Sequence, residues 1–97
     1  MKLIVSSAAA ADLHRLRAFL ADKDPRAAQR AISGIVRAID SLDLFPDRGR
    51  PTEIAGMREL MVPFGRSAYV VRFAHDPQRG EIVIARIWHS REARTSF

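Results

Sequence analysis

The sequence predicts an α+β domain with the element order β-α-α-β-β-β, in which a helical hairpin packs on an antiparallel sheet. Three features of the chain predict this fold. A short apolar segment comes first, two segments with helical apolar spacing follow it, and three apolar segments with short glycine-bearing breaks come last. The 97 residues leave room for one domain, residues 1–97, and contain no repeat, low-complexity tract or linker.

The first predicted strand covers residues 2–6, which are mostly branched or apolar and end at a serine pair. Ser6 or Ser7 can cap the next helix, because a hydroxyl accepts hydrogen bonds from the free N–H groups of a first helical turn. Apolar residues then recur at helical spacing, at Ala9, Leu13, Leu16 and Leu20. Asp12, Arg15 and Asp22 fall outside this stripe, and we expect them to be solvated.

The second predicted helix begins at Asp24-Pro25, because Asp caps a helix and Pro at the first helical position loses no hydrogen bond. Its apolar stripe has the same spacing and consists of Ala28, Ile32, Ile35, Ile39 and Leu42. About two residues separate the helices, so they should be antiparallel neighbours. Three arginines lie on this helix outside the stripe, at Arg26, Arg30 and Arg37.

The second half of the chain predicts a loop and then three strands. Residues 45–51 contain two Pro and one Gly, which favours a loop. The predicted strands are Arg58–Phe64, Ala68–Ala74 and Glu81–His89. The breaks between them are short and contain glycine, which is typical of an antiparallel meander.

Alternation along these strands predicts two different sheet faces. One face is apolar and should pack on the helical hairpin; it includes Leu60, Val62, Phe64, Tyr69, Val71, Phe73, Val83, Ala85, Ile87 and His89. The second face combines Met61, Val70, Ile84 and Trp88 with Arg72 and Arg86. No predicted element is left to cover this second face, so we interpret it as a partner surface. The alternative is that the tail, residues 91–97, folds over it.

The chain is basic, with 16 Lys and Arg against 11 Asp and Glu and a net charge of +5. Most of the cations are Arg, whose planar guanidinium binds phosphate and carboxylate, so the partner would be nucleic acid or an acidic protein segment. A GC-rich genome would also produce an excess of Arg. Charge alone does not choose between these interpretations.

The absence of cysteine excludes a disulfide scaffold, a thiolate nucleophile and a Cys-ligated metal site. It suits a reducing cytoplasm, where we expect the protein to act. No window approaches the roughly 20 apolar residues of a membrane span, so we expect no membrane partner. We place His14 and His75 at the surface, and scattered histidines do not make a metal site, so we expect neither a metal nor another cofactor.

Short motifs are spread over nearly the whole chain. In order, they are Ala11-Asp12-Leu13, Asp24-Pro25-Arg26-Ala27-Ala28, Leu42 followed by Phe45-Pro46-Asp47-Arg48-Gly49-Arg50, then Gly56-Met57-Arg58-Glu59-Leu60, Ala68-Tyr69-Val70-Val71-Arg72-Phe73 and Ile87-Trp88-His89-Ser90-Arg91. In this order and spacing they resemble the ParE/RelE toxins of type II toxin–antitoxin systems. The resemblance implies a helical hairpin on an antiparallel sheet. It also implies a hetero-oligomer with a cognate antitoxin, whose C-terminal segment wraps the toxin.

The family that the chain resembles divides by activity. ParE-like toxins poison DNA gyrase without catalysis, which links them to growth arrest and plasmid stabilization, whereas RelE-like toxins cleave mRNA on the ribosome. Cleavage needs a base, an acid and cations for the phosphate, and RelE-like toxins supply Lys and Arg from the sheet. Here the first strand after the loop offers Glu59 and Met61, and no Lys follows Lys23. This departure favours a ParE-like gyrase inhibitor with a ParD-like antitoxin. The alternatives are a ribosome-dependent endoribonuclease and a non-toxic binding module.

Three sets of candidate site residues follow. We expect the antitoxin to bind Met61, Val70, Arg72, Ile84, Arg86 and Trp88. Candidate contacts to the target are Arg48, Arg50, Arg58 and Arg91. An endoribonuclease would use His89 for proton transfer and Arg91, Arg72 and Arg86 for the phosphate.

Each of these sets has a structural alternative. His89 would be a strand-end residue hydrogen-bonded to the hairpin, and Arg58 would tie the loop 47–50 to the sheet. Trp88 could stack a nucleic-acid base or simply belong to a packed surface. Arg48 and Arg50 would belong to a solvated turn.

Overall fold

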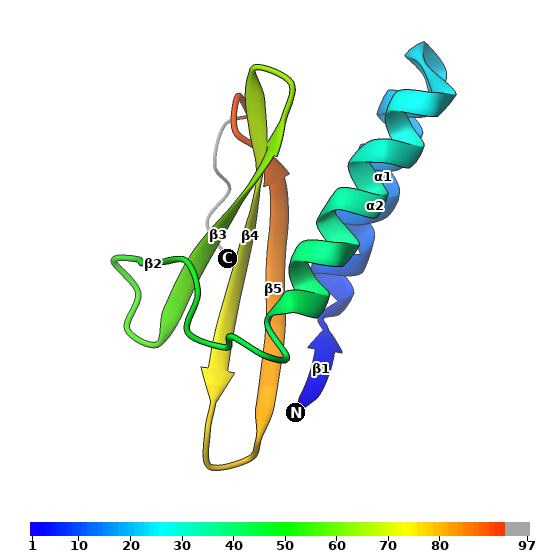
Figure 1. Cartoon of the computed structure of the whole chain (residues 1–97). Coiled ribbons are helices and arrows are strands. Elements are labelled where there is room, and N and C mark those ends of the chain that lie inside the picture. The colour runs from blue at the N-terminus through cyan, green and yellow to red at the C-terminus, as the bar shows by residue number, and fades with distance from the viewer. Residues whose placement is uncertain (93–97) are drawn as a thin grey trace.

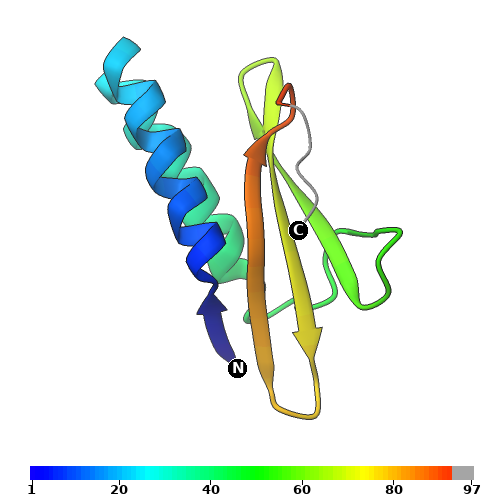
Figure 2. The same cartoon turned by 180° about the vertical axis from the view of Figure 1, so that it is seen from behind.

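Two helices lie side by side along one face of a five-stranded sheet in the computed structural model, which describes residues 1–92 (Figures 1 and 2). The elements are β1 (Lys2–Val5), α1 (Ser7–Lys23), α2 (Pro25–Ser41), β2 (Arg50–Pro51), β3 (Met57–Phe64), β4 (Ser67–Asp76) and β5 (Glu81–His89). The predicted α+β class and the helical hairpin are therefore confirmed. Neither helix combines the length and the apolar character that crossing a membrane requires, within the described residues.

Both helices begin at the predicted caps. Ser6 Oγ accepts a hydrogen bond from Ala9 N at 3.0 Å, and Asp24 Oδ1 accepts from Arg26 N and Ala27 N. Asp24 also ends α1, because its backbone N–H donates to Leu20 O. One residue thus closes one helix and opens the next, which makes the connection short and forces the helices to be antiparallel.

The strand order is β1-β5-β4-β3-β2, and the sheet is mixed rather than wholly antiparallel. The predicted meander is present as β3-β4-β5, and β1 joins it by pairing parallel with β5. This pairing completes part of the outer edge of β5, whose N–H and C=O groups would otherwise lack partners. The predicted loop 45–51 contains the short strand β2, which pairs with β3.

A β-bulge in β5 changes which side chains face the helices. Arg72 of β4 pairs with Arg86, but the next residue, Phe73, pairs with Ile84, so Ala85 is the extra residue. A bulge reverses the alternation of the strand beyond it. The predicted position of Ile84 on the uncovered face is therefore wrong: Ile84 is fully buried on the helix-facing side together with Ile87.

The hydrophobic core fills the space between the helices and this face of the sheet. It consists of Ala9, Leu16, Ala31, Ile35, Ile39, Leu42, Leu60, Val62, Tyr69, Val71, Phe73, Ile82, Ile84 and Ile87. Most of these residues lie on the predicted helical stripes and on the predicted apolar face of the sheet. The core therefore confirms the predicted packing, with the shift in β5 that the bulge introduces.

Candidate functional site

The side of the sheet that faces away from the helices is not covered by any described helix (Figures 1 and 2). We call this side the open face; the register places Glu59, Met61, Val70, Arg72 and Trp88 on it. Met61 is 40% exposed, whereas Val70 is buried. Of the tail that could have covered the face, only Arg91 and Glu92 belong to the described residues, and 93–97 lie outside them.

Arg72, the first of the two cations predicted for the open face, is already paired with carboxylates of this chain. Arg72 is 3% exposed and donates through Nε to Glu59 Oε2 at 3.0 Å, and its Nη2 lies 3.7 Å from Glu53 Oε1. The Trp88 ring lies over the Arg72 guanidinium, 5.2 Å from centroid to Cζ. Arg72 was predicted to meet carboxylates of a partner, but its nearest carboxylates belong to this chain.

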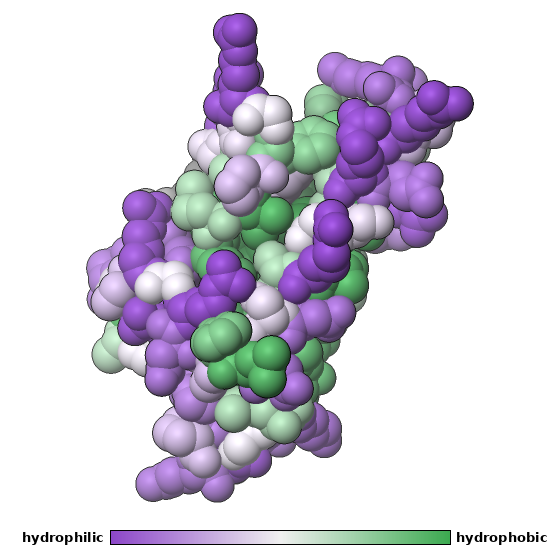
Figure 3. Space-filling model, in the orientation of Figure 1, coloured by the Kyte–Doolittle hydropathy of each residue, from purple (hydrophilic) through white to green (hydrophobic). Residues whose placement is uncertain are grey.

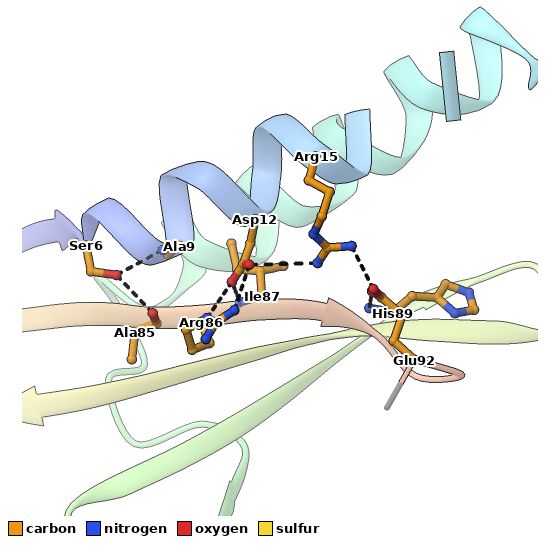
Figure 4. A network of polar contacts seen from close by, with 9 residues as sticks. All are labelled: Ser6, Ala9, Asp12, Arg15, Ala85, Arg86, Ile87, His89 and Glu92. Atoms are coloured by element: carbon orange, nitrogen blue, oxygen red, sulfur yellow. Dashed lines mark hydrogen bonds and ion pairs between the residues drawn. The ribbon is translucent and has the colours of Figure 1, made fainter. Parts of the chain in front are cut away.

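Arg86, the second predicted cation of this face, is turned toward the helices (Figure 4). Its Nε and Nη2 atoms donate to the two carboxylate oxygens of Asp12 on α1, at 2.9 and 3.0 Å. Asp12 Oδ2 also accepts from the backbone N–H of Ile87 at 2.8 Å. The expectation that Asp12 is solvated is wrong, because only 4% of it is exposed.

Asp12 stabilises a part of β5 that β1 does not reach, since β1 pairs only with Glu81 to Ile84. Burial raises the pKa of Asp12, but the hydrogen bonds from Arg86 and Ile87 and the positive charges of Arg86 and Arg15 outweigh it. The net pKa lies below its ordinary value, and hydrogen bonding to Asp12 raises the pKa of Arg86. Both groups are therefore charged at neutral pH.

Arg15 connects this ion pair to the end of β5 (Figure 4). Its Nη2 atom lies 3.7 Å from Asp12 Oδ1, and its Nη1 atom donates to Glu92 Oε2 at 2.7 Å. Glu92 Oε1 in turn accepts from the backbone N–H of His89 at 2.7 Å. The residues after β5 are thus held close to α1, which brings the predicted His-x-Arg segment beside the helix.

His89 ends β5 on the helix-facing side. Its Nδ1 accepts from Arg91 N at 3.1 Å, so Nε2 carries the proton of the neutral ring and donates to Ser67 Oγ at 2.9 Å. Its ring meets the Tyr69 ring edge-on at 5.2 Å. The structural alternative expected a hydrogen bond from His89 to the helical hairpin, but the ring bonds instead to Ser67 at the start of β4 and to the backbone of Arg91. Burial raises the pKa of Tyr69, and the negative charge of Glu92 adds to this shift.

A cleft of about 650 Å³ opens beside His89, between α1 and the hairpin end of the sheet. We call it the helix–sheet cleft; it is lined by Arg15, Leu16, Phe19, Leu20, Phe64, Gly65, Ser67, Tyr69, His89, Arg91 and Glu92. Its walls are mostly apolar, and Phe19 is 59% exposed. Sequence reasoning missed this cleft, because its walls come from four elements whose spacing depends on packing.

The loop before β3 is fixed to the sheet by Arg58, as one interpretation predicted. Arg58 donates through Nε to Arg48 O at 3.2 Å and through Nη2 to Gly49 O at 2.9 Å. Gly49 has a φ of 88°, and a Cβ there would lie 2.3 Å from Glu59 O, so only glycine fits. Arg48 and Arg50 are exposed, and Arg50 Nη2 lies 3.7 Å from Glu59 Oε1.

His75 is less exposed than predicted, because the same loop packs on it. Its Nδ1 lies 3.1 Å from Asp47 Oδ1, and only 14% of its side chain is exposed. His14 is exposed, as predicted. Within residues 1–92, no three His, Asp or Glu side chains gather in a way that could hold a metal ion.

The four residues named for an endoribonuclease do not form one constellation. His89 lies on the helix-facing side with its ring nitrogens engaged, whereas Arg72 lies on the open face beside Glu59. Arg86 is bound by Asp12, and Arg91 lies beside His89 at the rim of the cleft. What the site offers instead is an apolar cleft with cations at its rim, which is an arrangement for binding a partner.

The chain is similar to several known proteins. A family model described as the ParE toxin of the type II toxin-antitoxin system parDE matches residues 3–94. Toxin RelE1 of Caulobacter vibrioides is 41% identical over 95 residues, which cover 95% of this chain and 96% of that protein. Toxin RelE3 of the same organism is 42% identical over 83 residues, covering 86% and 87%. A solved structure, the chromosomal ParDE TA system from P. aeruginosa, matches with a TM-score of 0.74 and 29% identity over 92% of this chain and 95% of that one.

Proposed function

Because this chain belongs to the ParE family of toxins of type II toxin–antitoxin systems, we propose that it arrests growth by binding DNA gyrase and that a ParD-like antitoxin neutralises it. The family membership covers residues 3–94, nearly the whole chain. Gyrase as the target would place the toxin in the cytoplasm. A gyrase inhibitor of this kind acts by binding alone and needs no catalytic group.

The observation that carries the gyrase proposal is the internal neutralisation of the sheet arginines. Glu59 pairs with Arg72 and Asp12 pairs with Arg86, so these guanidinium groups are already engaged by carboxylates. A phosphate in a cleavage reaction would have to displace those carboxylates, which are held by charge-assisted hydrogen bonds. This favours inhibition by binding over cleavage of RNA.

The names of the Caulobacter relatives support the second candidate, a ribosome-dependent endoribonuclease, because both are called RelE toxins. In that case His89 would be the proton-transfer group, and Arg91 would be the nearest cation at the cleft. His89 would first have to release Ser67 or the N–H of Arg91. The site would have to rearrange on the ribosome before His89 could lose one of these two hydrogen bonds.

For the antitoxin, two neighbouring recesses suit one extended partner. The helix–sheet cleft lies on one side of Glu92, and a smaller recess of about 330 Å³ on the open face, which includes Met61, Val70 and Trp88, also reaches Glu92. A segment with apolar residues and acidic flanks could fill the cleft, meet Arg15 and Arg91 at its rim, and continue past Glu92 onto the open face. Such a path would wrap the toxin, as the family resemblance implies.

Two assays run in parallel test the choice of target. Purified toxin is added to gyrase with relaxed plasmid, and separately to ribosomes translating a defined mRNA. We expect loss of supercoiling in the first assay and intact mRNA in the second. Adding the cognate antitoxin in equimolar amount should restore supercoiling. Cleaved mRNA together with normal supercoiling would overturn the gyrase proposal and support the endoribonuclease.

A further inference from the structure

Helix α2 presents a row of arginines on its outer side that neither the antitoxin surface nor the core uses. Arg26, Arg30 and Arg37 are all exposed, and within residues 1–92 none of them takes part in an ion pair. We call these three residues the α2 arginine stripe. In Figure 3, hydrophilic side chains run along the part of the surface that α2 forms.

The stripe is straight and rigid. Its members are four and seven residues apart, which places them within about 40° of one another around the helix and over about 16 Å of its length. The opposite side of α2 carries Ile35 and Ile39, which are buried in the core. The helix is therefore fixed, and the three Cα positions keep their spacing.

The stripe differs from the arginines that tie the sheet and α1 together. Arg15, Arg72 and Arg86 each meet a carboxylate within 3.0 Å, which gives them a structural role. Arg26 and Arg30 instead form an i,i+4 pair of like charges, which slightly destabilises a helix. The unpaired charges thus lower the stability of α2 and are explained better by an anionic ligand than by the fold.

Arg30 and Arg37 separate an apolar recess beside β3 from an outer recess that all three arginines line, and the outer recess has only polar walls. It has a volume of about 510 Å³ and is lined by Arg26, Gln29, Arg30, Ser33 and Arg37, without an apolar residue. Protein interfaces have apolar and aromatic residues at their centre, whereas contacts to phosphates come from Arg, Ser and Gln side chains. Single-stranded nucleic acid is usually held by aromatic side chains as well, and the recess has none.

From these observations we propose that the α2 arginine stripe binds the sugar-phosphate backbone of a nucleic-acid duplex, without reading its sequence. Three guanidinium groups spread over about 16 Å cannot converge on one phosphate, but they can contact successive phosphates of a duplex. The stripe lies outside both antitoxin recesses, but a neighbouring recess that Arg30 and Arg37 also line shares Phe64, Gly65 and Tyr69 with the helix–sheet cleft, so the test below also measures antitoxin binding. Duplex binding would hold the toxin beside DNA whatever its protein target is.

The test measures binding of the purified full chain to a fluorescent 20-base-pair DNA duplex over a range of salt concentrations. Three phosphate contacts predict a slope of log K against log salt of about −2.7, and the double variant R30Q/R37Q should reduce that slope to about −0.9. The matched control is Arg79→Gln in the β4–β5 turn, whose side chain is 76% exposed, and it should leave the slope near its original value. Inorganic phosphate at equal ionic strength should compete no better than chloride.

Glutamine has nearly the helix propensity of arginine, so the double variant should keep the wild-type melting curve. Absence of duplex binding at low salt, or a slope that R30Q/R37Q does not change, would overturn the proposal. Binding to the cognate antitoxin is measured with the same variants. If R30Q/R37Q loses the antitoxin but retains the DNA, the stripe is a protein interface and the proposal is wrong.

Discussion

At the scale of single residues, Asp12 holds α1 against β5 at the point where β1 ends. Its carboxylate accepts from two side-chain atoms of Arg86 and from the backbone N–H of Ile87. Hydrogen bonds to a charged group are stronger than those between neutral groups. We therefore expect Asp12→Asn to lower the free energy of unfolding at pH 7 by about 2 kcal/mol, measured by urea denaturation.

The pH dependence of this effect follows from the lowered pKa of Asp12. A carboxylate whose pKa is lower in the folded state stabilises the fold above its unfolded pKa, here 3.8, and loses that contribution as the pH falls below this value. The stability difference between wild type and Asp12→Asn should therefore be constant from neutral pH to about pH 5 and shrink toward pH 2. A difference that stays the same at about pH 2 would show that the charge of Asp12 is not what matters.

His89 separates binding from catalysis. A toxin that works by binding needs no proton transfer at this position, whereas the loss of a general acid or base typically costs an enzyme about 10²–10⁴ in rate. We expect His89→Gln, which keeps hydrogen-bonding atoms near Ser67, to fold, bind antitoxin and still arrest growth on induction. A folded, antitoxin-binding variant that is harmless would instead identify His89 as a catalyst.

At the scale of elements, α2 carries the core of the helical hairpin. Ile35 is fully buried, and its neighbour Val36 is 42% exposed, so the two positions form a matched pair on one helix. Ile35→Ala should lower the free energy of unfolding by about 2–5 kcal/mol, because it leaves a cavity, and Val36→Ala should change it by less than about 0.5 kcal/mol. Urea denaturation of both variants checks this, and equal midpoints would mean that the helix faces the core differently.

The helices could be predicted from the sequence because their signals are local. The caps at Ser6 and Asp24 and the spacing of the isoleucines lie within a few residues of the structure they determine. The bulge at Ala85 has no such local signal. Ser6 Oγ donates to Ala85 O across 79 positions of sequence, and Asp12 accepts from Ile87 N across 75. Strict alternation therefore placed Ile84 on the wrong side of the sheet, whereas Arg86 pairs with Arg72 as alternation predicts and only its side chain reaches Asp12 on α1.

The sequence predicted only part of the candidate site, because some of its contacts join residues that are distant in sequence. The register shows Met61, Val70 and Trp88 on the open face, where alternation predicted them, since the strands are regular there. Pairing of Arg72 with Glu59 follows from a cross-strand register that the sequence does not specify. The helix–sheet cleft depends on how far α1 lies from the β3–β4 hairpin, and no pattern in the chain determines that distance.

At the scale of the whole molecule, two exposed phenylalanines test the antitoxin surface. Phe19 lies in the helix–sheet cleft and Phe45 in the loop after α2, and they are 59% and 60% exposed. If the antitoxin fills the cleft, Phe19→Ala should weaken the complex by more than about 1 kcal/mol while Phe45→Ala leaves it unchanged, by calorimetry. Trp88→Ala should weaken it to a similar degree if the partner continues onto the open face. Equal effects of the Phe19 and Phe45 changes would exclude the cleft.

The pairing of β1 with β5 connects the order of synthesis to the onset of toxicity. Lys2 pairs with Glu81. The strand β1 is therefore synthesised first but can pair only after β5, near the C-terminus, has been synthesised. A nascent chain that stops before Glu81 has both helices, but it lacks the edge on which β1 lies and the His89 wall of the cleft. Contacts this distant in sequence also form slowly. We therefore expect a chain that ends before Glu81 to lack both the partner of β1 and the completed cleft, so that toxicity would begin only after β5 has been synthesised.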